Sequence, residues 1–159
     1  MPQTGDGIWE SYRTDEFVLV VGQNPSPGVT KVSPLDLGEI ETIEQPDGGS
    51  GKIYKIAGQK LKFKPLTVER YVDGSPEDKV FMDWFKETFN LSAGTQGGSS
   101  ARRSGQIIKL HNGQPVLTFA FYNAWVKSTT FSDLEAGSTG HFKQTIVLEH
   151  EGLELIESA

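Results

Sequence analysis

The last third of the chain constrains the fold most, because residues 115–156 read as long β-strands and carry no catalytic motif. Asn112-Gly113, just before this region, is the strongest short-range signal for a β-hairpin, so antiparallel strands are expected at Gln106–His111 and Pro115–Val126. The second strand carries bulky side chains on one face and small ones on the other, namely Leu117, Phe119, Phe121 and Trp125 against Thr118, Ala120 and Ala124. We expect the bulky face to form core and the small-residue face to be free to meet another surface.

Further strands and one helix are predicted along the rest of the chain. The strand-like segments are Phe17–Val21, Val29–Ser33, Leu37–Glu44, Lys60–Val72 and His141–His150, the last extended by Leu153–Leu155. Within Lys60–Val72 the alternation changes phase at Pro65, which predicts a β-bulge. The helix is expected to follow Ser75 as its N-cap, with Pro76 at the first helical position and Asp78 placed for a capping box.

These segments predict a mainly β fold, an antiparallel β-sandwich or barrel of about seven strands flanked by one α-helix. A length of 159 residues suits a single domain, expected over residues 1–159. A flexible N-terminal arm is expected over residues 1–16, and a Gly- and Ser-rich exposed loop over residues 92–105.

Composition narrows the possible functions. The chain has no cysteine, which excludes disulfides, thiolate metal ligands and a cysteine nucleophile. It has no apolar run of the length needed to cross a membrane, and its first residues do not resemble a signal peptide, so synthesis in the cytoplasm is expected. The net charge of −6 would repel nucleic acid rather than bind it.

No segment of the sequence carries a convincing catalytic, metal-binding or phosphate-binding motif. The three histidines His111, His141 and His150 fall on three different elements, and the glycine clusters lack the flanking strand, helix and lysine of a phosphate-binding loop. Glu39 and Glu41 share one face of a strand that is expected to be solvated, which disfavours a glycosidase pair. We therefore expect no catalytic residue, no metal site and no cofactor, and hence no enzymatic activity.

Several short motifs, taken in their order along the chain, resemble a known family. They are Phe17–Val21, Glu39–Glu44, Gly58, Lys62-Phe63, Leu66–Arg70, Trp84, Asn123-Ala124-Trp125 and Glu149-His150-Glu151-Gly152. Over residues 15–156 this order is similar to the tail tube family of contractile-tailed bacteriophages and related contractile injection systems. The chain departs from the family pattern at Val126, where proline is common, and at Tyr71, where glycine is common.

The resemblance implies a structural subunit of the inner tube of a contractile tail or of a phage-tail-like injection particle. Such subunits form hexameric rings, and the rings stack into a hollow conduit for DNA or effector cargo inside a sheath. The implied partners are further copies of the chain, the sheath protein, and baseplate, tube-initiator and terminator proteins. DNA or protein cargo would pass through the lumen without specific binding, and the tube would be assembled in a virion tail or phage-tail-like particle.

The resemblance and the charge pattern together assign roles to residues. The family signature comprises Asn123, Ala124, Trp125, Glu149, His150, Glu151 and Gly152. Glu39 and Glu41 are the expected lumen-facing carboxylates, where they would repel acidic cargo. The candidate sheath contacts are Lys79, Lys86, Arg102 and Arg103, and the candidate inter-ring loop is Asp47, Gly48, Gly49, Ser50 and Gly51.

Alternatives to the tube subunit stay open at this point. Within the family, the chain fits a baseplate tube-initiator or a tube subunit loaded with an effector. Outside the family, a monomeric ligand- or carbohydrate-binding β-sandwich is the main rival, although most aromatic side chains fall on the expected core face. A hydrolytic enzyme on a sandwich scaffold is weaker, because no acid, base and nucleophile converge.

Overall fold

The computed structural model describes residues 11–22, 24–25, 28–90, 94–96 and 101–158. The strands are β1 (Phe17–Val21), β2 (Asn24–Pro25), β3 (Val29–Ser33), β4 (Glu39–Pro46), β5 (Ile53–Lys62), β6 (Leu66–Tyr71), β7 (Phe89–Asn90), β8 (Thr95–Gln96), β9 (Arg103–His111), β10 (Gln114–Phe131), β11 (Lys143–Glu149) and β12 (Gly152–Ser158). A 3-10 turn, η1 (Pro76–Lys79), leads into one α-helix, α1 (Val80–Thr88). The expected mainly β fold with one helix is confirmed.

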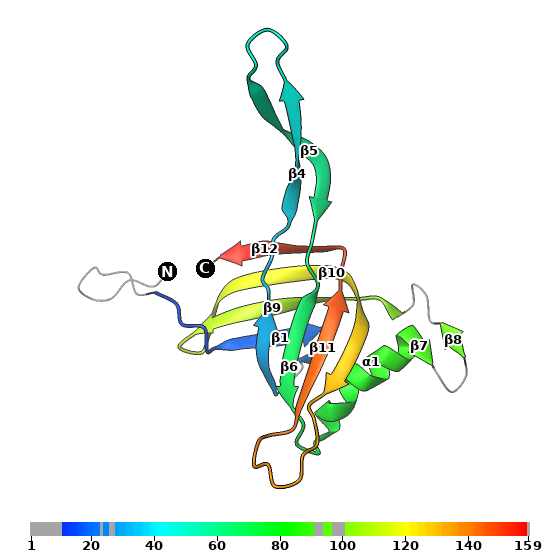
Figure 1. Ribbon diagram of the computed structural model, residues 1–159. Coiled ribbons are helices and arrows are strands. Elements are labelled where there is room, and N and C mark those ends of the chain that lie inside the picture. Colours follow the sequence, from blue (N-terminus) through cyan, green and yellow to red (C-terminus); the bar gives the residue numbers. More distant parts are fainter. Residues whose placement is uncertain (1–10, 23, 26–27, 91–93, 97–100, 159) are drawn as a thin grey trace, which may run out of the picture.

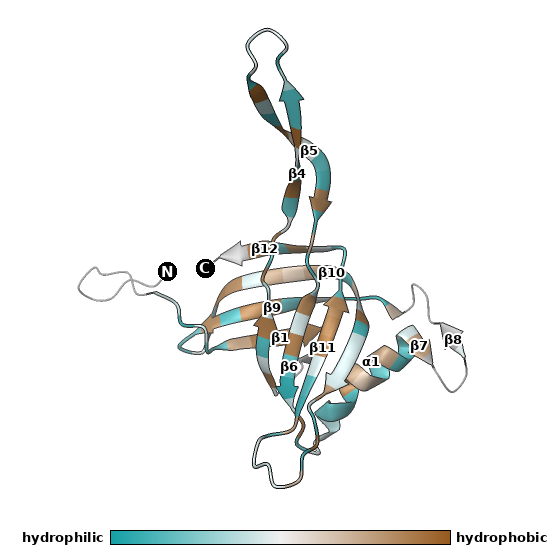
Figure 2. Ribbon diagram, viewed as in Figure 1, coloured by the Kyte–Doolittle hydropathy of each residue, from teal (hydrophilic) through white to brown (hydrophobic). Residues whose placement is uncertain are grey.

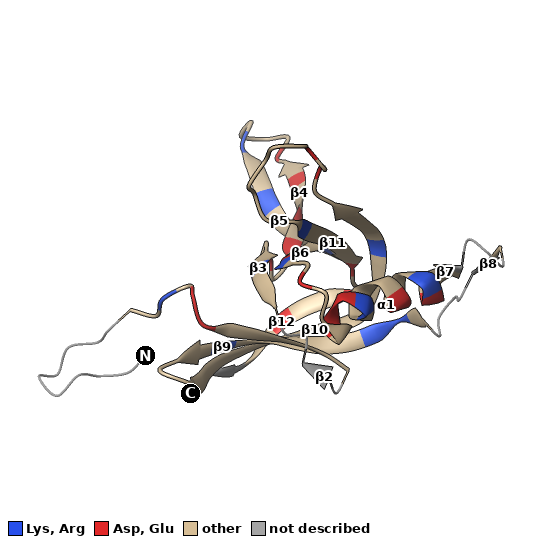
Figure 3. Ribbon diagram, turned by 90° about the horizontal axis from the view of Figure 1, so that it is seen from below, with Lys and Arg blue, Asp and Glu red and all other residues tan. Residues whose placement is uncertain are grey.

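Two sheets share the strand β10 and cross each other in space (Figure 1). We call the layer β2-β1-β9-β10-β12 sheet one, and the layer β10-β11-β6-β3 sheet two. All strand pairings in the described part of the chain are antiparallel. Helix α1 packs against β10 on the side of sheet one that carries sheet two (Figure 3).

The core lies between the two sheets and the helix. Its buried side chains come from both layers and from α1: Leu19, Val21, Leu66, Val68, Phe81, Trp84, Ile107, Phe121, Ala124, Val126, Ile146, Leu148 and Leu153. These apolar side chains supply the main driving force for folding, because their removal from water is favourable in proportion to the area buried. In the part of the chain that the structure covers, no helix is both long and apolar enough to cross a membrane.

A corner in β10 allows one strand to serve both sheets. Its first half pairs with β9 and β12, and its second half pairs with β11. Asn123 lies at the break with a φ of 51°, which is left-handed backbone that asparagine tolerates better than most residues. The extra residue shifts the alternation, so Ala124 and Val126 are fully buried. The prediction that Trp125 shares the core face with Phe121 is therefore wrong, because a strict two-residue period contains no bulge.

The segment Lys60–Val72 is two strands and not one bulged strand. β5 ends at Lys62 and pairs with β4, whereas β6 begins at Leu66 and pairs with β3 and β11. The change of phase at Pro65 therefore marks the passage from one sheet to another. Proline fits this position because it has no backbone N–H to donate to a ladder.

Local signals in two other places are confirmed. Asn112 and Gly113 have φ values of 51° and 77°, and they join β9 to β10 in the expected hairpin. Ser75 is the extended N-cap residue before η1, and Pro76 is at its start. The Asp78 carboxylate, however, accepts a hydrogen bond from the Gly74 backbone (2.7 Å) rather than completing the expected capping box with Ser75.

The ends of two expected loops can be placed in part. The predicted arm over residues 1–16 lies mostly outside the described residues, but the Lys109 Nζ donates to the Glu16 carbonyl over 2.9 Å. The predicted exposed loop over residues 92–105 is described only at 94–96 and from 101 onward. Ala101 is buried and β9 begins at Arg103, so the last residues of that range belong to sheet one.

Candidate assembly surfaces

Four strands of sheet one form a regular repeat. β1, β9, β10 and β12 alternate in direction, and their registers align one residue from each strand in the same row. Rows that face the core are Leu19-Ile107-Phe119-Leu155 and Val21-Gly105-Phe121-Leu153, and between them lies the oppositely facing row Val20-Gln106-Ala120-Glu154. A strand placed beside either edge would continue these rows if it kept the same alternation.

Both edges of this four-strand repeat offer backbone groups for pairing. The outer edge of β12 has no partner strand in the described part of the chain. The outer edge of β1 is paired only at Val20 and Val21, with the two-residue strand β2. Because the four strands alternate in direction, β12 of one copy placed beside β1 of another is antiparallel.

The face of sheet one that points away from the core carries acidic residues and no basic ones among its paired rows. It carries Val18, Val20, Ser104, Gln106, Ile108, Thr118, Ala120, Tyr122 and Glu154, and the row Val18-Ile108-Thr118 ends at Glu157 on β12. The Glu154 carboxylate accepts a hydrogen bond from the Tyr122 hydroxyl. That hydrogen bond is the main reason why the pKa of Tyr122 is raised above its ordinary value.

The two halves of the family signature meet at the corner of β10. The Asn123 Nδ2 donates to Oε2 of Glu151 over 2.8 Å, and Arg102 forms an ion pair with Oε1 of the same carboxylate. The Glu151 backbone N–H donates to the Tyr122 carbonyl over 2.9 Å. Glu149 is the cross-strand partner of Trp125. The signature thus fixes the point where β10 leaves sheet one.

His150 and Gly152, the rest of the signature, lie against the segment between β5 and β6. The His150 Nε2 is 2.9 Å from the Lys64 carbonyl, and its ring lies 5.7 Å from the ring of Phe63. A Cβ atom on Gly152 would lie 3.6 Å from the same Phe63 ring. The three histidines remain on separate elements, and no metal-holding group of three His, Asp or Glu side chains exists among the described residues.

The candidate sheath residues divide into two groups. Lys79 and Lys86 are exposed on η1 and α1, whereas the Arg103 Nη2 donates to both carboxylate oxygens of Glu87 (2.8 Å each). The Arg103 guanidinium also lies over the Trp84 ring, 5.3 Å from its centroid. Arg102 and Arg103 are therefore engaged in ion pairs within the chain.

Glu39 and Glu41 lie on a hairpin, β4–β5, that projects from the body of the molecule (Figure 1). The candidate inter-ring loop forms its tip. There the Asp47 carboxylate accepts hydrogen bonds from the Ser50 hydroxyl (2.7 Å) and the Gly49 backbone (3.1 Å). The hydrogen bond from Ser50 is the largest cause of a lowered pKa at Asp47.

The projecting hairpin mixes apolar and polar residues along both of its strands (Figure 2), and its large apolar side chains are exposed. Ile43 pairs with Ile56, and Pro46 pairs with Ile53, with no register shift between the two pairs. These pairs are three residues apart along each strand, so Ile56 and Ile53 point to opposite faces. Ile40 is 58% exposed and Ile43 is 48% exposed. Sequence reasoning did not find this surface. An apolar residue between polar ones, such as Ile40 between Glu39 and Glu41, is also typical of a strand that packs within its own chain.

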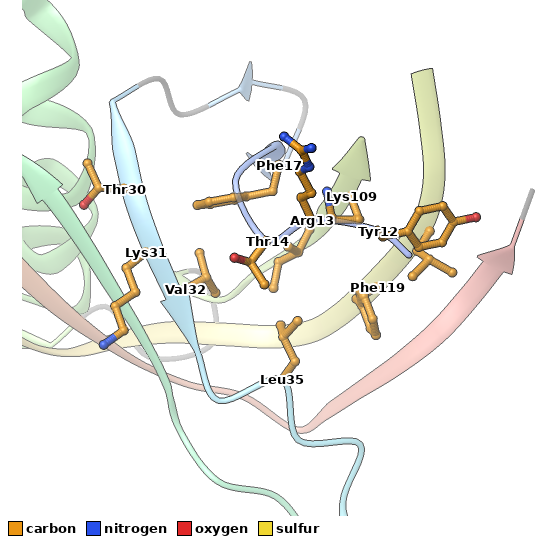
Figure 4. Close-up of a pocket in the computed structure, with 12 residues that line it drawn as sticks. Tyr12, Arg13, Thr14, Phe17, Thr30, Lys31, Val32, Leu35, Lys109 and Phe119 are labelled. Atoms are coloured by element: carbon orange, nitrogen blue, oxygen red, sulfur yellow. The ribbon is translucent and has the colours of Figure 1, made fainter. Parts of the chain in front are cut away.

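An apolar pocket of about 550 Å³ opens between the two sheets. Phe17 and Phe119 from sheet one face Val32 and Leu35 across it (Figure 4). Arg13 lies on the N-terminal side of the pocket and Lys31 on β3. The pocket was also not predicted from the sequence, since its walls come from segments that are far apart in the chain.

The chain was compared with known families and structures. The model of the family described as T4-like virus tail tube protein gp19 matches residues 13–154. No match to a curated protein sequence was found.

Solved structures with the same fold include a chain from the cap of the anti-feeding prophage, at 20% identity and a TM-score of 0.78, with 96% of this chain and 94% of that chain covered. A chain of the sheath–tube complex of the extracellular contractile injection system PVC gives 22% identity and a TM-score of 0.73, with 94% and 93% covered. A type six secretion system protein gives 12% identity and a TM-score of 0.52, with 88% and 83% covered.

The family match spans most of the chain, and it includes the corner of β10, the projecting hairpin and all of sheet one except the last residues of β12. It also confirms the resemblance carried by the signature residues. The chain belongs to the T4-like virus tail tube protein gp19 family, and it is a structural subunit of an inner tail tube.

Proposed function

We propose that six copies of the chain close sheet one into a continuous barrel around a lumen, and that such rings stack head to tail into a hollow tube inside a sheath. The observation that carries this proposal is the four-strand repeat of β1, β9, β10 and β12 with pairing groups at both edges. An even number of alternating strands lets every subunit join the next in the same antiparallel manner. Ring closure also removes the exposed sheet edges, which otherwise invite aggregation.

The interface in this ring is heterologous, because the β12 edge of one copy meets the β1 edge of the next. Such an interface forms a closed ring when the rotation between copies closes. The number six comes from the family resemblance. Four strands from each of six copies make a wide barrel, and wide barrels leave an open channel.

The lumen in this assembly is lined by the face of sheet one that points away from the core. Rings of Glu154 and Glu157, both on β12, then contribute its negative charge, and the wall offers DNA or acidic protein cargo no cationic binding site. The earlier assignment of Glu39 and Glu41 to the lumen requires the hairpin to bend inward. We favour Glu154, because it lies on the sheet itself.

The outside of the tube carries α1 and sheet two, which lie on the opposite side of sheet one (Figure 3). Lys79 and Lys86 are exposed there and remain the proposed contacts to the sheath. The tip of the hairpin, Asp47–Gly51, is the proposed contact to an adjacent ring. Baseplate and terminator proteins would meet the two ends of the tube. None of these roles requires catalysis.

Electron microscopy of the purified chain tests the proposal directly. Negative-stain images and light scattering over a range of concentrations should show rings or hollow tubes with six-fold symmetry, alone or after addition of baseplate proteins. Rings that never stack would favour a baseplate tube-initiator. A chain that stays monomeric under all of these conditions would contradict the proposal and favour the ligand-binding sandwich.

A further inference from the structure

We propose that β2 is a strap that covers part of the pairing edge of β1 in the free subunit, and that it leaves this edge when β12 of a neighbouring copy pairs there. The strap delays ring formation until the neighbour displaces it. This inference rests on the proposed ring closure, and it adds a regulatory step that closure alone does not require.

A backbone hydrogen bond shows which residues of β1 point toward its outer edge. The Gly22 N–H, just after β1, donates to the Ser104 carbonyl of β9 over 2.9 Å. The backbone groups of successive residues in a strand point alternately to its two sides, and the register between β1 and β9 has no shift. The groups of Phe17, Leu19 and Val21 therefore point away from β9, to the edge where another strand would pair.

β2 occupies the end of this edge. Its two residues lie opposite the last two residues of β1, with Asn24 beside Val21 and Pro25 beside Val20. While β2 is in place, the outward backbone groups of Val21 are not open to another strand. Neighbouring strands lie about 4.8 Å apart, so one stretch of an edge holds one strand at a time. β2 and the β12 strand of a neighbour therefore compete for this stretch.

The proline in β2 prevents a further strand from adding to the strap itself. The Asn24 backbone faces β1, so the backbone of the next residue, Pro25, faces away from it. Proline has no N–H, and the outer side of β2 therefore lacks a donor at this position. Very short edge strands and edge prolines both protect a sheet edge from unwanted pairing. β2 has both features, which suits a strand that guards an assembly edge.

The neighbouring β12 can replace the strap because it matches more of the edge. β2 pairs with two residues of β1, whereas β1 has five residues and β12 has seven. A strand that pairs along all of β1 forms more backbone hydrogen bonds than β2 forms. Phe17 and Leu19 lie beyond the reach of β2, so the neighbour can begin to pair there before the strap leaves. The strap thus slows assembly without blocking its end state.

A reversible disulfide tests the strap. The chain has no cysteine, so the variant Val20→Cys, Pro25→Cys can form one intramolecular disulfide only. Opposite residues of an antiparallel pair have Cα atoms about 4.5–5.5 Å apart, which suits a disulfide. The oxidised variant should stay monomeric, by light scattering and electron microscopy, at concentrations at which the wild type assembles. Reduction of the same sample should restore rings or tubes.

The control variant carries a disulfide between opposite residues on sheet two. Tyr71 and Lys143 are a cross-strand pair of β6 and β11, and both are exposed. Tyr71→Cys, Lys143→Cys should assemble equally when oxidised and when reduced. If Val20→Cys, Pro25→Cys also assembles equally in both states, the strap is wrong while the ring stands. If the wild type forms no ring under any condition, both proposals fail.

A second variant weakens the strap instead of locking it. Asn24→Pro removes the backbone N–H beside Val21, so the lag before assembly should shorten by roughly tenfold, because one fewer hydrogen bond has to break. Asn24→Ala is the matched control, since it keeps the N–H and should leave the lag unchanged. This pair also decides the question if the two cysteines impair assembly in the reduced form. A lag of Asn24→Pro no shorter than that of the wild type would contradict the strap.

Discussion

The Asn123 side chain donates a hydrogen bond to the Glu151 carboxylate over 2.8 Å, and this contact joins segments that are 28 residues apart in the sequence. Asn123 also adopts the left-handed conformation at which β10 turns from sheet one to sheet two. The contact therefore brings together two of the short motifs that resemble the family, and together they hold the corner on which both layers depend.

Replacing Asn123 by alanine should lower the free energy of unfolding by about 1–3 kcal/mol, since it removes a hydrogen bond and strains the left-handed backbone. Chemical denaturation of the isolated chain measures this loss. Asn123→Gly is the matched control, because glycine keeps the backbone conformation and loses only the side-chain contact. Equal losses in the two variants would show that backbone strain contributes nothing.

The ion pair between Arg70 and Asp78 should be essential for the link between β6 and η1. The Arg70 side chain is 1% exposed, its Nη1 is 2.7 Å from the Asp78 carboxylate, and the same Nη1 donates to Gln144 Oε1 over 3.3 Å. We expect Asp78→Ala to destabilise the chain by about 3–5 kcal/mol, because it leaves a buried charge without its partner. Thermal unfolding measures the effect. Asp83→Ala, on the exposed side of α1, should change stability by less than about 0.5 kcal/mol.

Gly105 has no space for a side chain. A Cβ atom there would lie 2.3 Å from the Val20 carbonyl oxygen and 2.5 Å from the Phe121 ring. Gly105→Ala should therefore separate β1 from β9 or displace Phe121 from the core, at a cost of about 1–3 kcal/mol or more. Soluble yield and the midpoint of urea unfolding report this effect. Gly48→Ala, which meets nothing within 4 Å, should leave both unchanged.

Reversing the charge of Glu154 should turn the lumen wall into a nucleic-acid-binding surface. Tubes of the Glu154→Lys variant are expected to retain DNA at low salt and to release it as salt rises, because lysine–phosphate contacts release counterions. A filter-binding or co-sedimentation assay measures retention against wild-type tubes. Asp133→Lys tubes carry the same charge change outside sheet one, and retention equal to that of Glu154→Lys would argue against a lumen lined by sheet one.

The Tyr122 hydroxyl provides a spectroscopic check of the same face. Its hydrogen bond to Glu154 raises the pKa of Tyr122, so Glu154→Gln should lower that pKa toward the ordinary tyrosine value. The variant should then ionise one tyrosine at lower pH than the wild type in an alkaline absorbance titration. Identical titration curves would mean that the hydrogen bond is absent in solution.

Local signals predicted those parts of the fold that local chemistry determines. Asn112-Gly113 specified its hairpin, and Ser75-Pro76 specified the helix start, because backbone conformation and capping depend on neighbouring residues. The corner at Asn123 was not predicted, since one left-handed residue leaves no mark on an apolar pattern. Instead, the strict alternation wrongly placed Trp125 in the core.

The projecting hairpin shows a second limit of predicting structure from sequence patterns. In β4 the apolar Ile40 stands between Glu39 and Glu41, as in many strands inside a domain, yet among the described strands β4 and β5 pair only with each other. Alternation indicates that a face will be covered, but it does not say which molecule covers it. The pocket was also beyond prediction from the sequence, because its walls include residues of β1, β3 and β10, which are far apart in the chain.

The 18-residue strand β10 has a mechanical consequence. Because both layers contain the same strand, a pull applied to sheet one reaches sheet two through covalent bonds of the backbone. Layers joined only by side-chain packing can slide past each other under shear, whereas these two layers are tied along one continuous chain. The subunit is thus built to move as a rigid body when load is applied to its wall.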